Sequence, residues 1–388
     1  MLSARATSER ESPVSVASDP YLLTPGPLTT SATTKKAMLH DWGSRDTRFI
    51  EMTARVRSRL LELISAGDDH VCVPIQGSGT FAIEATLGTL LSDDDKLLIL
   101  LNGAYGRRMA TICDYQGRDY QVIETAEDVP CDPDALERAL IDDPETTHVA
   151  VVHCETTSGI LNPIGAIAEV VSRHGRSLVI DAMSTFGALE INADNTPFDA
   201  VIASSNKCLE GVPGLGFAII RRSTLEDCSG NAPSLSLDLY EQWRGLESNG
   251  QWRFTPPTHV IAALDQALDE LDQEGGVSAR GARYTDNCET LMSGMSELGF
   301  VSALDEADQA PIILTFLTPA DPHFDFNEFY DHLSNHGFLI YPGKLTNADT
   351  FRVGCIGRLD TSDMQAALEV MRSALTEMGV TEGAPHPR

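Results

Sequence analysis

Residues 198–217 read Phe198-Asp-Ala-Val-Ile-Ala-Ser-Ser-Asn-Lys207-Cys-Leu-Glu-Gly-Val-Pro-Gly-Leu-Gly-Phe217. A short apolar strand ends here in small polar residues, which are followed by a lysine and a Gly/Pro-rich loop. We expect Lys207 to lie in a partly desolvated place at the edge of buried strands. Burial lowers the pKa of a lysine, and a neutral amine forms a Schiff base with a carbonyl compound. An isolated Asn-Lys pair usually marks a surface loop, so this interpretation depends on the rest of the chain.

An aspartate ends an upstream strand in Ser177-Leu-Val-Ile-Asp181-Ala-Met-Ser-Thr-Phe-Gly187. A carboxylate at the C-terminal end of a buried parallel strand is costly without a partner, and open α/β sheets bind ligands at this end. One predicted strand separates Asp181 from Lys207, which brings the two strand ends together. An acid that pairs with a pyridinium nitrogen and a lysine that holds an aldehyde are what pyridoxal phosphate (PLP) requires. We therefore predict a PLP site with Asp181 and Lys207 as catalytic residues.

A Gly-rich turn follows the strand predicted over residues 71–75 and precedes a helical pattern over 81–91. Its sequence is Gln76-Gly-Ser-Gly-Thr80. Strand, turn and helix in this order aim free N–H groups and the positive end of a helix at a phosphate. Most turns of this type bind nothing, but beside the lysine and the aspartate the turn predicts a phosphate site. Its residues are Ser78, Gly79 and Thr80.

Three further positions are predicted to contact the cofactor. Tyr105 follows a strand in Asn102-Gly-Ala-Tyr-Gly106, where its ring can stack on a flat cofactor or serve as a rim or core aromatic. Thr156 follows another strand and places a hydroxyl within reach of the phenolic oxygen of the cofactor. Asn206, which precedes the lysine, completes the set. For Glu155 we expect a structural role, in which its carboxylate holds loop N–H groups, with a catalytic role as the alternative.

Together these motifs resemble the fold-type-I PLP enzymes of the class V aminotransferase family. The resemblance extends from about Tyr21 to about Met378. It is carried by the lysine stretch and by Leu22-Leu-Thr-Pro-Gly-Pro27, Asp41-Trp-Gly-Ser-Arg-Asp46, Gln76 to Thr80, Asn102 to Gly106, His153-Cys-Glu-Thr-Thr-Ser-Gly-Ile-Leu-Asn-Pro163 and Phe351-Arg-Val-Gly354. The PLP motifs are specific, and the segments 41–46 and 153–163 are less so.

The resemblance implies an α/β fold, with a large domain around a mainly parallel central sheet and a smaller C-terminal α+β domain. It also implies a homodimer with active sites at the subunit interface. The loop Gln251-Trp-Arg-Phe-Thr-Pro-Pro257 would cross to the partner, where Thr255 would bind the phosphate of the partner's cofactor. The ring of Tyr105 would cover the pyridine face.

The substrates expected are a small anionic amine and a keto acid. Arg352 lies within a short apolar strand, where a guanidinium needs an anionic partner. We predict that it binds an incoming carboxylate, with a fixed salt bridge as the alternative. Arg45 is a second anion-binding candidate, or else a solvated residue at the start of a helix. Alanine–glyoxylate and serine–pyruvate aminotransferases share the PLP motifs, so the amine stays open, and a non-catalytic PLP-fold protein is a further alternative.

Composition limits the other possibilities. The chain has 388 residues, of which 42% are hydrophobic and 22% charged, as in ordinary globular proteins. A formal net charge of −29 argues against a nucleic-acid partner, whose phosphates would be repelled. An anionic substrate must enter the same acidic protein, so arginines and backbone N–H groups have to reverse the field at the site.

No apolar run reaches the roughly 18 residues needed to span a bilayer, and the N-terminus lacks an apolar core of signal-peptide length. We therefore expect a cytoplasmic protein without a membrane partner. Eight cysteines are scattered singly without zinc-site spacing, which indicates reduced, buried thiols and no metal site.

The chain is expected to divide into three parts. Residues 1–20 are a disordered leader, residues 21–275 comprise an N-terminal arm and the large PLP-binding domain, and residues 276–388 form the small domain. A strand over 216–221 is expected to close the sheet in antiparallel orientation, and residues 223–250 are expected to be irregular.

Overall fold

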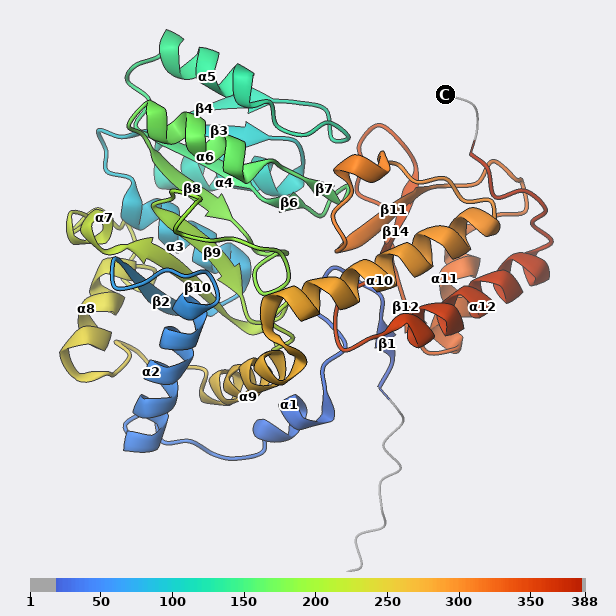
Figure 1. The fold of residues 1–388 in the computed structure, drawn as a ribbon, viewed down its shortest axis with the longest axis horizontal. Coiled ribbons are helices and arrows are strands. Elements are labelled where there is room, and N and C mark those ends of the chain that lie inside the picture. The colour runs from blue at the N-terminus through green and yellow to red at the C-terminus, as the bar shows by residue number, and fades with distance from the viewer. Residues whose placement is uncertain (1–18, 386–388) are drawn as a thin grey trace, which may run out of the picture.

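The computed structural model describes residues 19–385, so almost all of the leader predicted for residues 1–20 lies outside the described part. The chain forms a large α/β domain and a smaller C-terminal domain, which confirms the predicted fold class (Figure 1). Helix α9 (Thr258–Glu274) ends at Gly275, and the long helix α10 (Gly276–Glu297) then leads into the small domain. The domain boundary after residue 275 stays a prediction.

Within residues 19–385, seven strands form the central sheet in the order β2-β10-β9-β8-β5-β3-β4. They are β2 (His70–Gly77), β10 (Gly214–Arg221), β9 (Ala200–Ser204), β8 (Ser177–Asp181), β5 (His148–Val152), β3 (Lys96–Leu101) and β4 (Asp119–Glu124). All neighbours are parallel except β10, which runs antiparallel to both β2 and β9, as predicted. Because β2 and β9 both oppose β10, β2 runs in the direction of the parallel strands. The C-terminal ends of those strands therefore meet at one edge of the sheet.

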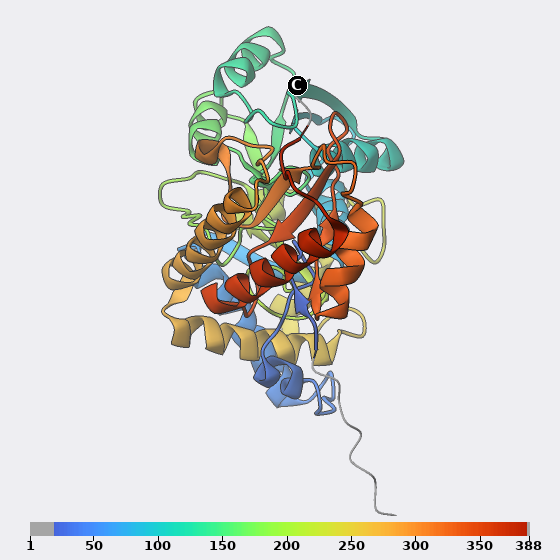
Figure 2. The same ribbon diagram turned by 90° about the vertical axis from the view of Figure 1, so that its right-hand side faces the viewer.

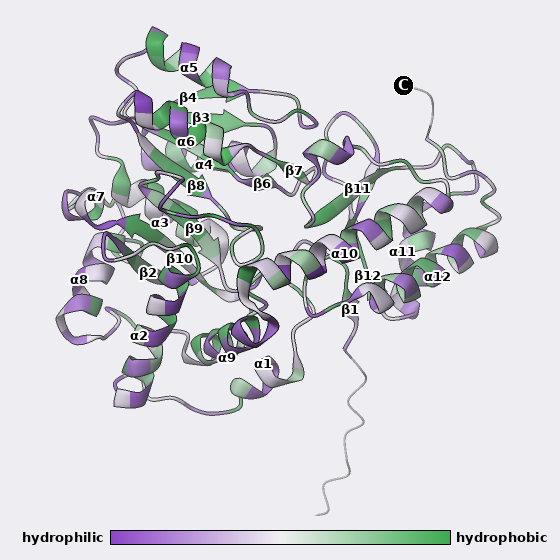
Figure 3. Ribbon diagram, viewed as in Figure 1, coloured by the Kyte–Doolittle hydropathy of each residue, from purple (hydrophilic) through white to green (hydrophobic). Residues whose placement is uncertain are grey.

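Helices cover both faces of this sheet. One face packs against α2 (Thr47–Glu62), α5 (Pro133–Asp142), α6 (Ile164–Arg173) and α9, and the other against α3 (Gly79–Leu90) and α4 (Ala104–Gln116). In β3, Leu98 and Leu100 enter the first core, whereas Leu97 and Ile99 enter the second. Side chains alternate along a strand, so strands that are apolar throughout must be covered on both sides. Figure 3 shows these hydrophobic strands between more polar helices.

The prediction that residues 223–250 are irregular was wrong in part. This segment contains α7 (Arg222–Glu226) and α8 (Leu239–Asn249). The side chain of Asp238 caps α8 by accepting a hydrogen bond of 2.9 Å from the backbone N–H of Glu241. Leu239, Trp243 and Leu246 recur at helical spacing and are buried beneath the sheet. A cap and an apolar stripe together outweigh the polar composition of the segment.

The small domain contains the antiparallel sheet β11-β14-β13, formed by β11 (Ile313–Leu317), β14 (Thr350–Gly354) and β13 (Tyr341–Pro342). With α10, the helices α11 (Phe326–Asn335) and α12 (Thr361–Met378) surround its own apolar core. Figure 2 shows these helices from the side of the small domain. The shorter elements of the described chain are α1 (Ala32–Ala37), the hairpin of β6 (Cys154–Glu155) and β7 (Ile160–Leu161), and a 3-10 turn at Glu306–Asp308.

The N-terminal arm belongs structurally to both domains. Its strand β1 (Tyr21–Leu22) pairs in parallel with β12 (Phe338–Leu339) of the small domain, and the rings of Tyr21 and Phe338 stack with centroids 5.1 Å apart. The arm then continues towards the C-terminal edge of the large sheet. There the carbonyl of Pro25 meets the side chain of Lys207.

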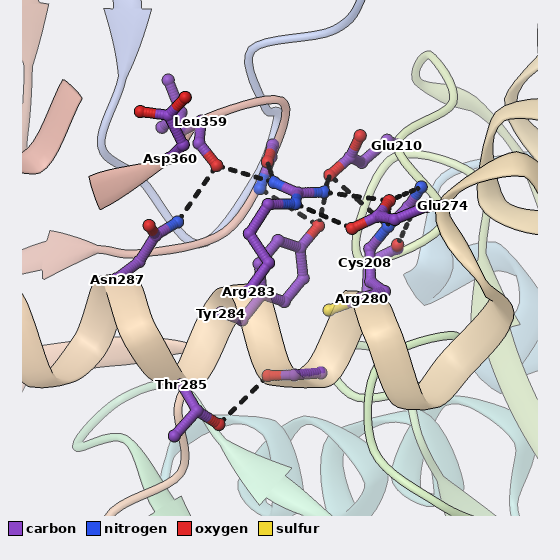
Figure 4. Close-up of polar contacts among 12 residues, drawn as sticks. Cys208, Glu210, Glu274, Arg280, Arg283, Tyr284, Thr285, Asn287, Leu359 and Asp360 are labelled. Carbon is purple, nitrogen blue, oxygen red and sulfur yellow. Dashed lines mark hydrogen bonds and ion pairs between the residues drawn. The ribbon is translucent and has the colours of Figure 1, made fainter. Parts of the chain in front are cut away.

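A buried charge cluster around Glu210, three residues after this lysine, joins the two domains (Figure 4). The carboxylate of Glu210 accepts hydrogen bonds from Arg283 (2.7 Å) and from the hydroxyl of Tyr284 (2.6 Å). Arg283 also contacts Glu274 and donates to the carbonyls of Gly357 and Leu359, just after β14. The cluster therefore connects the loop after β9 to α10 and to the end of β14.

No helix in the part of the chain that the structure describes is both long enough and apolar enough to cross a membrane.

Candidate active site

A cavity of about 250 Å³ opens at the C-terminal edge of the central sheet. It collects residues from the ends of β8 and β9, from the segments that follow β2, β3, β8 and β9, and from the start of β10, as expected for open α/β sheets. Its walls are Ser78, Gly79, Thr80, Ile83, Tyr105, Arg108, Asp181, Met183, Ser204, Asn206, Lys207, Pro213 and Gly214. Seven residues predicted from the sequence are among them, namely Asp181 at the end of β8 and six residues that follow β2, β3 and β9.

Lys207 projects from the turn after β9. Its ammonium Nζ donates a hydrogen bond of 2.6 Å to the carbonyl oxygen of Pro25. Burial lowers the pKa of Lys207 to about 8, against the opposing influence of the Asp181 charge. A lysine with this pKa is partly neutral near physiological pH, which is the form that reacts with a carbonyl compound.

Asp181 ends β8 and is buried, with 4% of its surface exposed. One carboxylate oxygen, Oδ1, accepts a hydrogen bond of 2.9 Å from the backbone N–H of Met183. The other oxygen accepts none from residues 19–385, and Asp181 lines the cavity. Burial raises the pKa of Asp181 to about 7. A cationic partner inside the cavity would reverse that effect.

The N-terminus of α3 also lines the cavity. Ser78 is its N-cap residue, but its hydroxyl makes no capping hydrogen bond, so the first N–H groups of the helix stay free for a ligand. A Cβ on Gly79 would overlap the Met183 side chain, with its Cε only 2.7 Å away, so the turn has no room for a larger residue there. The hydroxyl of Thr80 accepts a hydrogen bond of 3.2 Å from Arg108.

Arg108 is a site residue that sequence reasoning missed. It lies one turn after Tyr105 on α4, and its guanidinium carbon is 4.8 Å from the centroid of the Tyr105 ring. No helix was predicted over residues 104–116, although an arginine three residues after the tyrosine shares its face on any helix. The arginine adds a positive charge beside the hydroxyl of Thr80.

Glu155 has the structural role predicted for it. Its buried carboxylate accepts hydrogen bonds from the backbone N–H groups of Tyr105 (3.0 Å) and Gly106 (3.4 Å), and from Thr157. It thereby fixes the start of α4 and the position of the Tyr105 ring. His153 is also structural, because its ring nitrogen Nδ1 shares a hydrogen bond of 2.9 Å with Thr185.

Thr156 and Arg352 lie on the side of the site nearest the small domain. Thr156 lines a smaller cavity of about 30 Å³ that shares Tyr105, Asp181 and Lys207 with the main one. Arg352 on β14 is 2% exposed and donates to two backbone carbonyls, those of Thr156 (2.8 Å) and Pro342 (3.0 Å). It forms no ion pair with any carboxylate of residues 19–385, so the fixed salt bridge considered above is not present in that part.

Arg45 and Thr255 lie elsewhere. Both line a separate surface cleft of about 370 Å³, together with Gln251, Trp252 and Arg253. Neither belongs to the walls of the lysine cavity in the same chain. A role for Thr255 at a cofactor phosphate therefore requires a second copy of the chain.

The cavity residues fit PLP. A free carboxylate oxygen of Asp181 can accept from a protonated ring nitrogen, and the free N-terminus of α3 with Arg108 suits a phosphate. The hydroxyl of Ser204 is buried at the cavity without a hydrogen-bond partner among the described residues. Lys207 supplies the amine. Each end of the cofactor therefore meets groups of the complementary charge.

Comparison with known proteins defines the class. Residues 2–334 match the family model described as aminotransferase class-V. This match covers most of the chain, so the protein belongs to the class V aminotransferases and is an enzyme whose cofactor is pyridoxal phosphate.

More specific relatives share this chain over nearly its full length. A 2-aminoethylphosphonate–pyruvate transaminase of Pseudomonas fluorescens is 56% identical over 94% of this chain and 99% of its own. A 2-aminoethylphosphonate–pyruvate transaminase of Burkholderia lata is 55% identical over 95% and 98%. Among solved structures, an alanine–glyoxylate aminotransferase of Nostoc sp. superposes with a TM-score of 0.87 at 22% identity, covering 94% of this chain and 97% of that one. The similarity to this solved structure shows that the two chains share the same fold.

Proposed function

We propose that the protein transfers the amino group of 2-aminoethylphosphonate to pyruvate, which gives phosphonoacetaldehyde and L-alanine. The observation that carries the proposal is the cavity in which Lys207, Asp181 and the N-terminus of α3 converge. The relatives named for this reaction, at 55–56% identity over more than nine-tenths of the chain, support the choice of substrates.

The proposed cofactor contacts follow from the cavity walls. Ser78, Gly79, Thr80 and Arg108 hold the phosphate, Asp181 holds the ring nitrogen, and Tyr105 covers the ring. Thr156 and Asn206 complete the contacts at the edge of the ring. When bound, PLP supplies a carbonyl group that bonds to amines and a ring that accepts electrons from the carbon losing its proton.

Lys207 has two tasks in this proposal. It holds the cofactor, and once displaced by the substrate amine, its neutral Nζ accepts a proton from the reacting carbon and returns it. The pKa of about 8 suits this task, because both protonation states are populated near neutral pH. Pro25 restrains Nζ through its carbonyl, so the amine stays near the place where the proton is transferred.

Arg352 is proposed to bind the acid group of each substrate. Its hydrogen bonds to two neutral carbonyls orient the guanidinium without neutralising it. A buried arginine without a carboxylate partner in the described chain is costly unless an anion completes its contacts. This supports binding of the pyruvate carboxylate and of the phosphonate in turn.

The active form is proposed to be a homodimer in which Thr255 reaches the cofactor phosphate of the partner. The separate cleft that holds Thr255 and Arg45 supports this, since these residues do not line the cavity of their own chain. We also propose a cytoplasmic location, which is supported by the eight free and buried cysteines.

The test is a product assay with purified enzyme and added PLP. We expect 2-aminoethylphosphonate with pyruvate to give phosphonoacetaldehyde, seen by phosphorus NMR, and an equal amount of alanine. Alanine or serine offered with glyoxylate or pyruvate should react much more slowly. If alanine with glyoxylate, or serine with pyruvate, is the faster pair, the substrate assignment is wrong and the class assignment stands.

A further inference from the structure

Cations without acidic partners gather around the cavity. Most arginines of α2 and α10 are paired with carboxylates, as expected in a chain with 57 acidic and 28 basic residues. Arg108, Lys207, Lys344 and Arg352 form no ion pair with any carboxylate of the described chain. They contact instead a hydroxyl, carbonyls or the Tyr105 ring. The cavity of this acidic protein is therefore bordered by cations whose charges no ion pair within the described chain neutralises.

Of these four cations, Lys344 is the one without a role in the proposed function. It lies in the loop between β13 and β14, at the mouth of the site, and its side chain is exposed. Its Nζ is 5.7 Å from the centroid of the Tyr105 ring, which itself lines the cavity. The charges of Lys344 and Arg352 both act on Lys207 and help to lower its pKa, so both are felt inside the cavity.

The loop that carries Lys344 is fastened on both sides. The N–H of Gly343 donates a hydrogen bond of 2.9 Å to the carbonyl of Thr350 on β14, and a Cβ on Gly343 would overlap the backbone of Thr350. Two residues beyond the lysine, the N–H and hydroxyl of Thr346 donate to the carboxylate of Glu127 at 2.8 and 3.0 Å. Glu127 belongs to the large domain, so the loop bridges the two domains across the site.

The same loop also contacts the buried arginine. The carbonyl of Pro342, two residues before the lysine, accepts the hydrogen bond from Nε of Arg352. Glu127, which contacts the loop, accepts hydrogen bonds from Thr346 and forms no ion pair with Lys344. An exposed lysine is flexible, but its backbone is fixed here and its charge is not cancelled within the described chain.

We propose that Lys344 binds the phosphonate group of the amine donor together with Arg352, and that it helps the enzyme to distinguish phosphonates from carboxylates. This inference rests on the proposed function and names a residue for its specificity. A carboxylate carries one charge, which one guanidinium matches. A phosphonate carries up to two charges on three oxygens, as phosphate esters do, and a second cation then adds affinity. The lysine acts as a point charge, suited to a third oxygen outside the plane of the arginine fork.

The test compares Lys344→Gln with Lys344→Arg in the holoenzyme, and Lys36→Gln is the matched control. Lys36 is an exposed lysine on α1, without an ion pair in the described chain and away from the site. Calorimetry measures binding of ethylphosphonate and of propionate. Ethylphosphonate is the phosphonate donor without its amino group, and propionate is the corresponding carboxylate. Lys344→Gln should weaken ethylphosphonate binding about tenfold or more and propionate binding by much less. Lys344→Arg should retain the preference, and Lys36→Gln should change neither affinity.

Equal weakening for both anions would overturn the proposal, because Lys344 would then act only through a general field. No change with Lys344→Gln would overturn it as well. Turnover separates this inference from the proposed function. If the wild-type enzyme does not use 2-aminoethylphosphonate, the proposed function fails. If it does and Lys344→Gln leaves the KM for this donor unchanged, only the role of Lys344 fails.

Discussion

The ammonium group of Lys207 donates its hydrogen bond to the carbonyl of Pro25, a residue 182 positions earlier in the chain. Pro25 belongs to the arm whose first strand is paired with the small domain. The position of Lys207 therefore depends on the arm and on both domains. The conformation of this lysine is a property of the assembled fold and not of its own loop.

Replacing Gly26 by alanine should displace Lys207. Gly26 has φ +124°, and a Cβ there would overlap Nζ of Lys207, with Cδ only 2.6 Å away. A misplaced catalytic group costs on the order of 100-fold in rate, and we expect kcat to fall by about that factor. The visible absorbance band of the lysine-bound cofactor should weaken in parallel.

The matched control is Gly175→Ala. Gly175 also has a positive φ, +62°, but nothing lies within 4 Å of a Cβ there. It should cost about 1–2 kcal/mol of stability from backbone strain and leave kcat unchanged. If Gly26→Ala and wild type have equal kcat, the contact between the arm and Lys207 is not needed to position the lysine.

Glu210→Gln should loosen the joint between the domains. Glu210 is buried, has φ +57°, and holds Arg283 and Tyr284 through its carboxylate. Arg283 keeps its contact with Glu274, so the loss of the Glu210 charge and of its hydrogen bonds should destabilise the protein by about 1.5–3 kcal/mol. Tyr284→Phe removes only a hydroxyl and should cost about 1–3 kcal/mol. Denaturant unfolding measures both, and a Glu210→Gln variant as stable as wild type would refute the role of the cluster.

Asp181→Asn should impair function and stabilise the protein prepared without cofactor. The pKa of Asp181 in the fold is about 7, above its ordinary value of 3.8, so the carboxyl contributes stability below about pH 4 that is lost as the pH rises through 7. The stability advantage of the variant should grow by up to about 1.4 kcal/mol per pH unit between pH 4 and 7, then level off. Unfolding at a series of pH values measures this slope.

With PLP present, the same variant should lose about 100-fold or more in kcat, because the ring nitrogen loses its charged partner. In the unfolding experiment without cofactor, a stability advantage of Asp181→Asn that does not vary with pH would contradict the raised pKa of Asp181.

A mixed dimer tests the role of Thr255. Lys207→Ala and Thr255→Glu should each be nearly inactive, the second because a carboxylate repels the cofactor phosphate. A dimer with one chain of each kind, isolated with two affinity tags, contains one intact site if Thr255 serves the partner. It should then show roughly half of the wild-type activity. A mixed dimer without activity would show that Thr255 acts in its own chain or that the enzyme does not share sites.

The site residues at the strand ends of the central sheet could be predicted because each can be recognised from the sequence of its own segment. Lys207, Asp181 and the turn at Ser78 each follow an apolar strand, and parallel strands deliver their C-terminal ends to one edge. The helix α8 was missed because its apolar stripe is sparse and lies among acidic residues. Its stability comes from packing beneath the sheet, which composition does not reveal.

Contacts between distant segments could not be predicted. The Pro25–Lys207 hydrogen bond, the cluster around Glu210 and the Glu127–Thr346 contact each join segments more than 70 residues apart. They depend on how the two domains dock, and no periodicity in either partner encodes that. Arg108 could have been predicted as a site residue, because it lies one helical turn after Tyr105. It was missed because no helix was predicted over α4.

In the proposed function, Lys207 holds a cofactor which accepts the amino group of 2-aminoethylphosphonate. The most direct test is the absorbance spectrum of the purified enzyme during addition of this amine without any keto acid. We predict that the visible band of the lysine-bound cofactor falls while the absorbance of the pyridoxamine form rises, and that pyruvate then restores the first band. A band that responds only to alanine or serine would contradict the donor, and no band after addition of PLP would contradict the role of Lys207.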